Sequence, residues 1–458
     1  MAPAAWGGVS GPMDAAPRPS NGALAAFVAP CLPLAGVGVP LTLHLPTYYA
    51  RDLGLSLSAV GLAFLAVRLA DMGVDPLLGV LMDRTRGRLG RFRPWLIATI
   101  PILMLGSLML FMARPGVSAV WLWLGLLVVY LAYSMGSLAQ QAWASALSPD
   151  YHQRSRIFGW WQTGNLVAIL VILLIPPLVA LGLKGTRAEG VQAMGWFVIV
   201  LAPITVAIAV WRVGEPATAP RATRPWRASD YLVLLADPAV ARLMLTDLMM
   251  GWAPGITTTL FLFYFDQIKR VPEAESNLLL LVYIVAATLS APAWSWLAIR
   301  IGKHRALAVN AALIPISLLL VMAVPMDLPA VAVGVMLLAG VPYSGASPLL
   351  RAMLADAGDQ LQLRTGIDRT ALLYSVLTGT AKIGSALALT TFIGLDLLGF
   401  KAQAAHNSAA ALAGLQAMFV GLPLILSVLS VAVILGYRLD APRHAEIRAA
   451  LAQRGAAE

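Results

Sequence analysis

The sequence predicts an all-α membrane protein with twelve transmembrane helices arranged in two halves of six. Of its 458 residues, 59% are hydrophobic and only 12% are charged, whereas a soluble domain carries about 25% charged residues. The apolar residues gather in runs of about 20 or more, the length that a helix needs to cross the bilayer core. The basic residues gather in the short segments between these runs, so topology explains the net charge of +10 without a nucleic-acid partner.

Six apolar runs precede a long polar interruption and six follow it. Their approximate spans are 23–49, 57–82, 95–113, 118–147, 157–183 and 191–213, then 238–265, 277–300, 304–325, 329–355, 370–398 and 409–437. The turn Arg114-Pro115-Gly116 separates the third run from the fourth. The interruption contains three prolines and a cluster of arginines, and we therefore expect two halves, 23–213 and 238–437, joined by a cytoplasmic linker at 214–237.

The distribution of lysine and arginine predicts that both termini face the cytoplasm. In that orientation 21 of the 32 basic residues lie in cytoplasmic segments, seven in external segments and four within spans. Cytoplasmic loops of membrane proteins carry such an excess. Residues 1–22 lack the basic region and short apolar core of a cleavable signal, so a disordered lead is expected there, and 438–458 form a cytoplasmic tail. The expected location is a bacterial inner membrane, with the bilayer as partner and the chain as a monomer.

A weak internal repeat relates the two halves. The basic segment 83–93 follows the second span, and the basic turn 300–305 follows the eighth, which is the corresponding place in the second half. Matching turns of this kind indicate parallel duplication of a six-helix unit, and such folds bind their substrate between the halves near the middle of the bilayer. This is the layout of the major facilitator fold.

Four segments resemble one particular family. They are RLADMGVDPLLGVLMDRTRGRLGRFRPW, ALSPDYHQRSRIFGW, APAWSWLAIRIGKHR and SPLLRAMLADAGDQLQLRTGIDRTALLYSVLTGTAKIGSALAL. In chain order they resemble the signatures of the glycoside–pentoside–hexuronide cation symporters, the family of the melibiose permease. The resemblance implies a secondary active transporter rather than an enzyme. Such a protein moves a small organic solute, for example a sugar, glycoside or uronide, together with a cation by alternating access.

The resemblance implies a cation-coupling site on the second span. The family's two acids correspond to Asp71 and Asp75, and its lysine on the eleventh span corresponds to Lys382. The spacing of four puts both acids on one helical face. Because a buried lysine is costly unless it is paired, we expect Lys382 to neutralise the acids when the coupling ion is absent. Arg68 completes the expected cluster, and the alternative is a purely structural ion pair between Arg68 and the acids.

The coupling ion is either H+ or Na+, and the sequence favours H+. Sodium-using relatives often have an asparagine beside the second acid, where this chain has Val74. Na+ needs several oxygen ligands, which Ser134 or Ser137 would have to complete, whereas a proton needs one buried carboxylate. No other cofactor is expected. Five scattered histidines and one cysteine provide neither a metal cluster nor the nucleophile–base pair of an intramembrane enzyme.

The substrate residues differ from those of galactoside carriers in this family. Those relatives hold their sugar with acids in the first and fourth spans, and this chain has no acid in 22–50 or 118–147, so a galactoside is not expected. The candidate pocket residues are Tyr48, Gln140, Gln141, Trp143, Trp161, Gln162 and Asn165. Aromatic rings stack on sugars and on other apolar faces alike, so a carrier of an amphipathic, lipid-like molecule remains the alternative.

The arginine-rich loop after the second span is interpreted as an intracellular gate that also sets the orientation. The candidate gate residues are Asp83, Arg84 and Arg91 in that loop, and Arg305 after the eighth span. Two further polar residues within spans receive structural interpretations. His44 is expected to make a satisfied polar contact rather than to relay protons, and Asp247 is expected to pair with Arg242.

Overall fold

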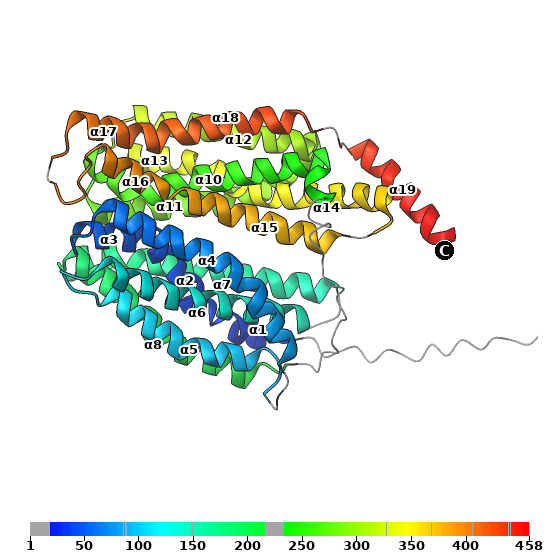
Figure 1. Cartoon of the computed structure of the whole chain (residues 1–458), viewed down its shortest axis with the longest axis horizontal. Coiled ribbons are helices and arrows are strands. Elements are labelled where there is room, and N and C mark those ends of the chain that lie inside the picture. The colour runs from blue at the N-terminus through cyan, green and yellow to red at the C-terminus, as the bar shows by residue number, and fades with distance from the viewer. Residues whose placement is uncertain are drawn as a thin grey trace, which may run out of the picture.

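Twelve helical segments build the protein. The computed structural model describes residues 19–85, 87, 89–147, 151–215, 233–326, 328–367, 369–404, 406–437, 439 and 441–457. Within this part of the chain, twelve segments are long and apolar enough to cross a membrane, from Asn21–Arg51 to Ala409–Leu435. They form two groups of six, and Figure 1 shows the two groups one above the other. The predicted all-α membrane fold with two six-helix halves is confirmed.

The N-terminal half begins with a composite span. It consists of α1 (Asn21–Val28), α2 (Cys31–Val39), the π-helical turn η1 (Pro40–His44) and α3 (Leu45–Arg51). The other spans are α4 (Leu57–Arg84), α5 (Arg93–Phe111), α6 (Ala119–Ala146), α7 (Tyr151–Pro177) with η2 (Leu178–Gly182), and α8 (Arg187–Arg212). Ser56, Ser118 and Thr186 start α4, α6 and α8, because each side chain accepts a hydrogen bond from a backbone N–H of the first turn.

The C-terminal half contains three single and three composite spans. The single ones are α10 (Pro238–Gln267), α11 (Glu273–Ile301) and α12 (Lys303–Ala323). The composite ones are α13 (Pro329–Gly340) with η3 (Val341–Ser344) and α14 (Ala346–Thr365), α15 (Thr370–Leu387) with α16 (Thr390–Leu397), and α17 (Ala409–Gln416) with η4 (Ala417–Gly421) and α18 (Leu422–Leu435). After the last span, α19 (Ala441–Ala457) packs against α14.

The tenth span is broken in its middle by the 3-10 turn η3, which contains Pro342. Proline removes a backbone donor from the helical ladder, and side chains of neighbouring helices bind the carbonyl groups at the break. Trp294 Nε1 and Ser290 Oγ donate to the Val341 carbonyl at 2.8 and 2.9 Å, and Asn310 Nδ2 donates to the Pro342 carbonyl at 2.7 Å. Irregular backbone at membrane depth is tolerated where it is buried in protein or lines a cavity. Because transporters often bind their substrates beside such breaks, we expect a binding site near η3.

The two halves meet where α4 packs on α15 and α16, and where α7 packs on α11. Gly61 allows the close approach of α4, because a Cβ at this position would lie 3.0 Å from the Leu389 carbonyl oxygen. The start of α1 and the whole of α19 lie at the same end of the molecule (Figure 1). We call this the terminal end and the opposite end the far end.

Candidate functional site

A cluster of charged side chains joins the two halves near the middle of the spans. Lys382 on α15 donates to Asp71 on α4 at 2.9 Å, and it also pairs with Asp75 one turn further along α4. Asp71 Oδ1 accepts a second hydrogen bond, at 2.6 Å, from Ser134 Oγ on α6. The Asp71 side chain is 7% exposed and that of Asp75 is 25% exposed. The three residues that the resemblance assigns to one site are therefore in contact.

Arg68 lies beside this cluster, and within the described chain it pairs with neither aspartate. Its Nη1 donates to Ser385 Oγ at 3.3 Å, and its guanidinium lies 5.2 Å from the centre of the Tyr130 ring. Its Nε is buried without a hydrogen-bond partner among the described residues. The structural alternative, in which Arg68 is the ion-pair partner of the acids, does not describe this geometry, because Lys382 makes that contact.

A cavity of about 410 Å³, the central cavity, lies between the halves next to Arg68. Thr42 and Arg68 line it from the N-terminal half, and Asp247, Ser347 and Ser385 contribute polar side chains from the C-terminal half. Cavities of about 300–1,000 Å³ commonly hold small organic ligands. The central cavity therefore has the size and the mixed charge that a polar small molecule requires.

Asp247 is a cavity residue that the sequence-based prediction assigned to a different contact. Its carboxylate accepts a hydrogen bond from Thr380 Oγ1 on α15 at 2.6 Å, and the residue is 8% exposed. The expected ion pair with Arg242 is wrong, because among the described residues the structure has no such pair. An acid well inside an apolar span is itself a signal of a functional site, and that signal outweighs proximity to an arginine in the sequence.

Three of the seven predicted substrate residues are packed inside the N-terminal half. The Tyr48 hydroxyl donates to the Ala113 carbonyl at 2.8 Å, and Gln140 Nε2 donates to the Phe27 carbonyl at 3.1 Å. Trp143 is fully buried and packs edge-on against Phe27. These three side chains are held by protein contacts and do not line the central cavity, so we leave them out of the proposed site.

The other four predicted substrate residues lie on α6 and α7, also outside the lining of the central cavity. Gln141 and Gln162 are exposed, whereas Trp161 and Asn165 are partly buried. Asn165 Nδ2 donates to the Trp161 carbonyl at 2.9 Å, and Trp161 Nε1 is buried without a partner among the described residues. Their contact with a substrate stays a prediction.

The predicted gate residues lie at the terminal end. Arg84 and Arg305 are exposed there, and the side chain of Asp83 lies outside the described residues. Arg91 is tied to its own half, since its Nε donates to the Met82 carbonyl at 3.2 Å. The gate assignment stays a prediction.

A carboxylate anchors the same loop to the start of α5. Glu215 accepts hydrogen bonds from the backbone N–H groups of Arg91 at 2.6 Å, of Phe92 at 3.0 Å and of Arg93 at 3.2 Å. A negative charge is favourable at a helix N-terminus, where unpaired N–H groups converge. The sequence pattern contained no cue for this contact, because Glu215 follows α8 and is distant from the loop in the chain.

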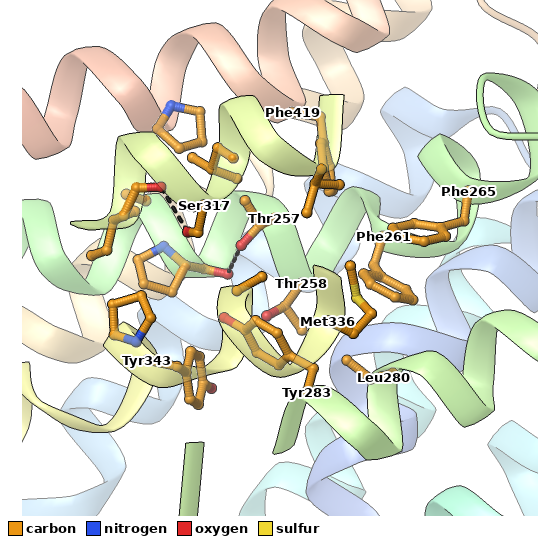
Figure 2. A pocket seen from close by; sticks show the side chains of 18 residues that line it. Thr257, Thr258, Phe261, Phe265, Leu280, Tyr283, Ser317, Met336, Tyr343 and Phe419 are labelled. Carbon is orange, nitrogen blue, oxygen red and sulfur yellow. Dashed lines mark hydrogen bonds between the residues drawn. The ribbon is translucent and has the colours of Figure 1, made fainter. Parts of the chain in front are cut away.

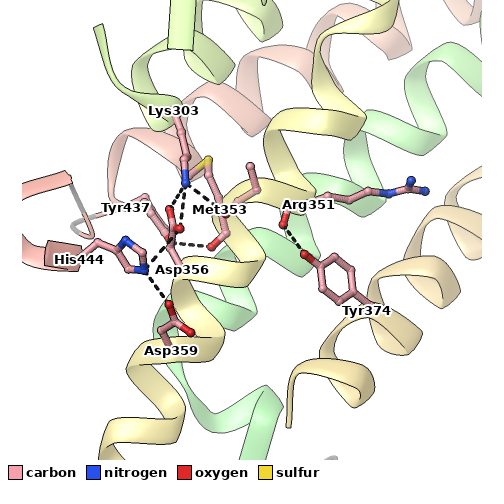
Figure 3. Close-up of polar contacts among 9 residues, drawn as sticks. Lys303, Arg351, Met353, Asp356, Asp359, Tyr374, Tyr437 and His444 are labelled. Carbon is pink, nitrogen blue, oxygen red and sulfur yellow. Dashed lines mark hydrogen bonds and ion pairs between the residues drawn. The ribbon is translucent and has the colours of Figure 1, made fainter. Parts of the chain in front are cut away.

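Ion pairs also tie α19 and α12 to α14 at the terminal end of the C-terminal half. Lys303 lies 2.6 Å from Asp356, and His444 Nε2 lies 2.9 Å from Asp359, as Figure 3 shows. These contacts fix elements of one half to each other.

At the far end, polar contacts join the two halves. They are Arg51 with Asp266 at 2.6 Å, Arg187 with Glu273, and His44 Nε2 with Asn277 Oδ1 at 2.9 Å. The Nε2 contact of His44 is the expected polar contact, but its Nδ1 is buried without a hydrogen-bond partner among the described residues, so the side chain is only half satisfied. Among the described residues, all hydrogen bonds and ion pairs between the halves lie at this far end or around the central charge cluster.

Known proteins share this fold and sequence pattern. A family described as MFS/sugar transport protein matches residues 26–441. The isoprimeverose transporter of Lactiplantibacillus pentosus is 25% identical over 413 residues, which cover 87% of this chain and 84% of the relative. The glucuronide carrier protein homolog of Escherichia coli (strain K12) is 23% identical over 370 residues, which cover 79% and 80%.

Two solved structures are similar to this chain in fold, at low sequence identity. A bacterial homolog of the human lysosomal transporter Spinster superposes with a TM-score of 0.65 at 14% identity, covering 91% of this chain and 96% of that chain. The nucleoside transporter NupG superposes with a TM-score of 0.62 at 14% identity, covering 91% and 98%. A nucleoside transporter and a homolog of a lysosomal transporter therefore share this arrangement of helices.

Proposed function

The chain belongs to the MFS/sugar transport protein family, and on that premise we propose a cation-coupled symporter that carries a sugar, glycoside or uronide by alternating access. One observation carries the proposal: Lys382 of one half contacts Asp71 and Asp75 of the other, beside a central cavity of about 410 Å³. The relatives named for isoprimeverose and glucuronide support this substrate class.

The charge cluster links cation binding to the contact between the halves. Without a bound cation, the Lys382 ammonium pairs with the carboxylates of both Asp71 and Asp75, which leaves one net negative charge on these three residues. A cation that reaches an aspartate neutralises it and weakens the attraction between α15 and α4. Ionised groups at membrane depth are costly unless they are paired, so the bound cation completes the neutralisation of the cluster, and Lys382 keeps both carboxylates paired when the carrier returns empty.

Geometry favours H+ as the coupling ion and Asp75 as the residue that takes it. Asp75 Oδ1 is buried without a hydrogen-bond partner among the described residues, and the Asp75 side chain is more exposed than that of Asp71. Asp71 is fixed by Ser134 and Lys382. For Na+, the cluster offers two carboxylates and the Ser134 hydroxyl, while the side chain of Val74 contains no oxygen atom.

The terminal end faces the cytoplasm of a bacterial cell in this proposal, as the basic residues predict. The structure is then an inward-facing state, because the polar contacts between the halves close the far end. The chain acts as a monomer, since the central cavity and the charge cluster are both complete within one chain.

Uptake into proteoliposomes tests the proposal. Labelled xylosides, glucosides and glucuronides are offered with an imposed pH gradient or Na+ gradient. We expect a pH gradient to drive accumulation, and Asp75→Asn to abolish accumulation while exchange of labelled for unlabelled solute persists. Asp359→Asn, which removes a carboxylate outside the cavity, is the control. Accumulation driven by Na+ at constant pH would contradict H+ coupling, and normal accumulation by Asp75→Asn would contradict the site.

A further inference from the structure

A second, smaller cavity of about 70 Å³ lies inside the C-terminal half (Figure 2). We call it the annex. Pro254, Thr258 and Tyr343 line both the annex and the central cavity. The two spaces therefore adjoin at these three residues.

The wall of the annex is mostly apolar, and two of its hydroxyl groups, those of Thr257 and Ser317, are already hydrogen-bonded. Thr257 Oγ1 donates to the Pro254 carbonyl at 3.0 Å, and Ser317 Oγ donates to the Ile314 carbonyl at 2.8 Å, as the dashed lines in Figure 2 show. Large apolar side chains complete the walls, among them Phe261, Leu280, Leu318, Met336 and Phe419. An apolar cavity in a protein stays dry and binds apolar groups, so the annex favours a hydrocarbon group over a hydroxyl group.

Tyr343 stands between the two cavities because the tenth span is broken at η3. The residue is 43% exposed, and its ring packs against Tyr283 with the ring centroids 5.4 Å apart. Transporters place their substrates beside discontinuous helices near the middle of the bilayer. The break at η3 therefore places the Tyr343 ring at the boundary between the central cavity and the annex.

We propose that the annex is a subsite for a short alkyl aglycone, which enters it while the sugar to which it is attached lies in the central cavity. This inference rests on the proposed transport of sugars or glycosides. A dry cavity of about 150 Å³ takes a benzene ring. The annex has about half that volume, so it fits two or three carbon atoms better than an aromatic ring or an acyl chain. The preferred substrate is then a short-chain glycoside rather than a lipid-like molecule.

Binding of glycosides with increasing chain length tests this subsite. The full-length protein in lipid nanodiscs is titrated calorimetrically with the free sugar and with the methyl, ethyl, propyl, hexyl and phenyl glycosides of xylose, glucose and glucuronic acid. Each methylene group that enters the annex is expected to tighten binding about 4-fold. Affinity should therefore rise by about 15-fold from methyl to propyl, and the hexyl and phenyl glycosides should lose this gain.

Two substitutions on α13 change the volume of the annex in opposite directions. Ala339→Leu fills it and should remove the gain from methyl to propyl while the methyl glycoside still binds. Met336→Ala enlarges it and should move the optimum to the hexyl or phenyl glycoside. Val333→Ala, at an exposed position of the same helix, should leave the chain-length profile unchanged.

The outcomes separate this inference from the proposed function. Equal affinity of the wild type for methyl and propyl glycosides, or an unchanged profile in Met336→Ala, would overturn the alkyl subsite and leave sugar transport standing. If no sugar or glycoside in the panel binds, the proposed function is overturned together with the subsite. The profile of Met336→Ala decides the matter even if Ala339→Leu does not fold.

Discussion

Lys382 and Asp75 belong to opposite halves of the molecule and form an ion pair between α15 and α4. The same pair is both an electrostatic contact and a mechanical one, since it helps to hold two six-helix units together. Neutralisation of the Asp75 carboxylate therefore also weakens the contact between the two halves. This double character leads to the first of five predictions.

Lys382→Met is expected to abolish uptake. The substitution leaves Asp71 and Asp75 without their cation, and removing one partner of a buried ion pair costs up to about 3–5 kcal/mol; the cost is smaller here because the Lys382 side chain is 29% exposed. Combining Lys382→Met with Asp75→Asn restores the balance of charge and should restore exchange without accumulation. Counterflow and gradient-driven uptake distinguish the two activities. Normal accumulation by Lys382→Met alone would refute the coupling site.

Asp266→Asn is expected to open the far end. The substitution weakens the bond between Asp266 and Arg51, and hydrogen bonds to charged groups are worth about 1.5–3 kcal/mol. A cysteine at Thr42, introduced together with Cys31→Ser, should then react about 10-fold faster with a membrane-impermeant maleimide applied at the far end. The exchange Arg51→Asp with Asp266→Arg should restore the slow rate.

A pair at the surface provides the control for this labelling. Arg443→Ala breaks the exposed ion pair with Glu446 in α19 and should leave the labelling rate unchanged, because exposed pairs contribute little. If Asp266→Asn labels no faster than Arg443→Ala, the Arg51 contact does not close the far end.

Gly384→Ala is expected to destabilise the C-terminal half and to reduce uptake. A Cβ at this position of α15 would lie 2.6 Å from the Leu248 carbonyl oxygen of α10, and forcing extra volume into a packed interface costs about 1–3 kcal/mol. The displacement would also move Lys382, two residues away. Gly379→Ala on the same helix is the matched control, because its Cβ would meet nothing within 4 Å. Thermal unfolding followed by intrinsic fluorescence should separate the two variants, and equal midpoints would contradict the packing argument.

Asp247→Asn is expected to raise the KM for sugar uptake about 10- to 100-fold with a smaller effect on the maximal rate. The buried carboxylate lines the central cavity and is a strong acceptor for sugar hydroxyl groups, each such charged hydrogen bond being worth about 1.5–3 kcal/mol. Initial uptake rates over a range of sugar concentrations measure the effect. Arg242→Ala should leave KM unchanged. If both variants behave alike, Asp247 has a structural function.

Asp52→Asn is expected to raise the free energy of unfolding at neutral pH, and to raise it by a smaller amount in acid. Burial raises the pKa of Asp52, against the opposing effects of Arg187 and Arg51, and its Oδ2 is buried without a hydrogen-bond partner among the described residues. A carboxyl group with a raised pKa in the folded state destabilises that state when it is ionised, and the penalty disappears as the pH falls through its pKa. Unfolding midpoints at pH 7.5 and pH 4.5 measure the change. A gain of equal size at both pH values would contradict this explanation.

The spans and their grouping were predictable because the bilayer imposes a simple rule of length and hydrophobicity. The charge cluster was predictable only in part. The spacing of Asp71 and Asp75 places them on one face of α4, but no local pattern states that α15 lies against this face. The family resemblance supplied Lys382 as their partner, and the structure places the three side chains together.

The central cavity was the hardest part to predict, because its lining depends on how helices break and pack. The candidate residues came from the first, fourth and fifth spans, because the family resemblance directed attention to the first and fourth. The cavity is instead lined largely by α10, α14 and α15. A turn signal inside an apolar run, Pro342 followed by Gly345, marks the break that places Tyr343 beside the cavity, and Asp247 was visible as an isolated acid within a span.

The walls of the annex all belong to α10 and the helices that follow it, whereas both aspartates belong to α4. If the annex selects the aglycone and the two aspartates bind the cation, as we propose, these two functions are encoded in different halves of one gene. A recombination event within the linker would bring a new aglycone preference to an unchanged ion-binding helix. Hybrid carriers assembled from the halves of two relatives offer a practical route to new substrates, provided that the incoming half supplies the lysine that faces Asp71 and Asp75.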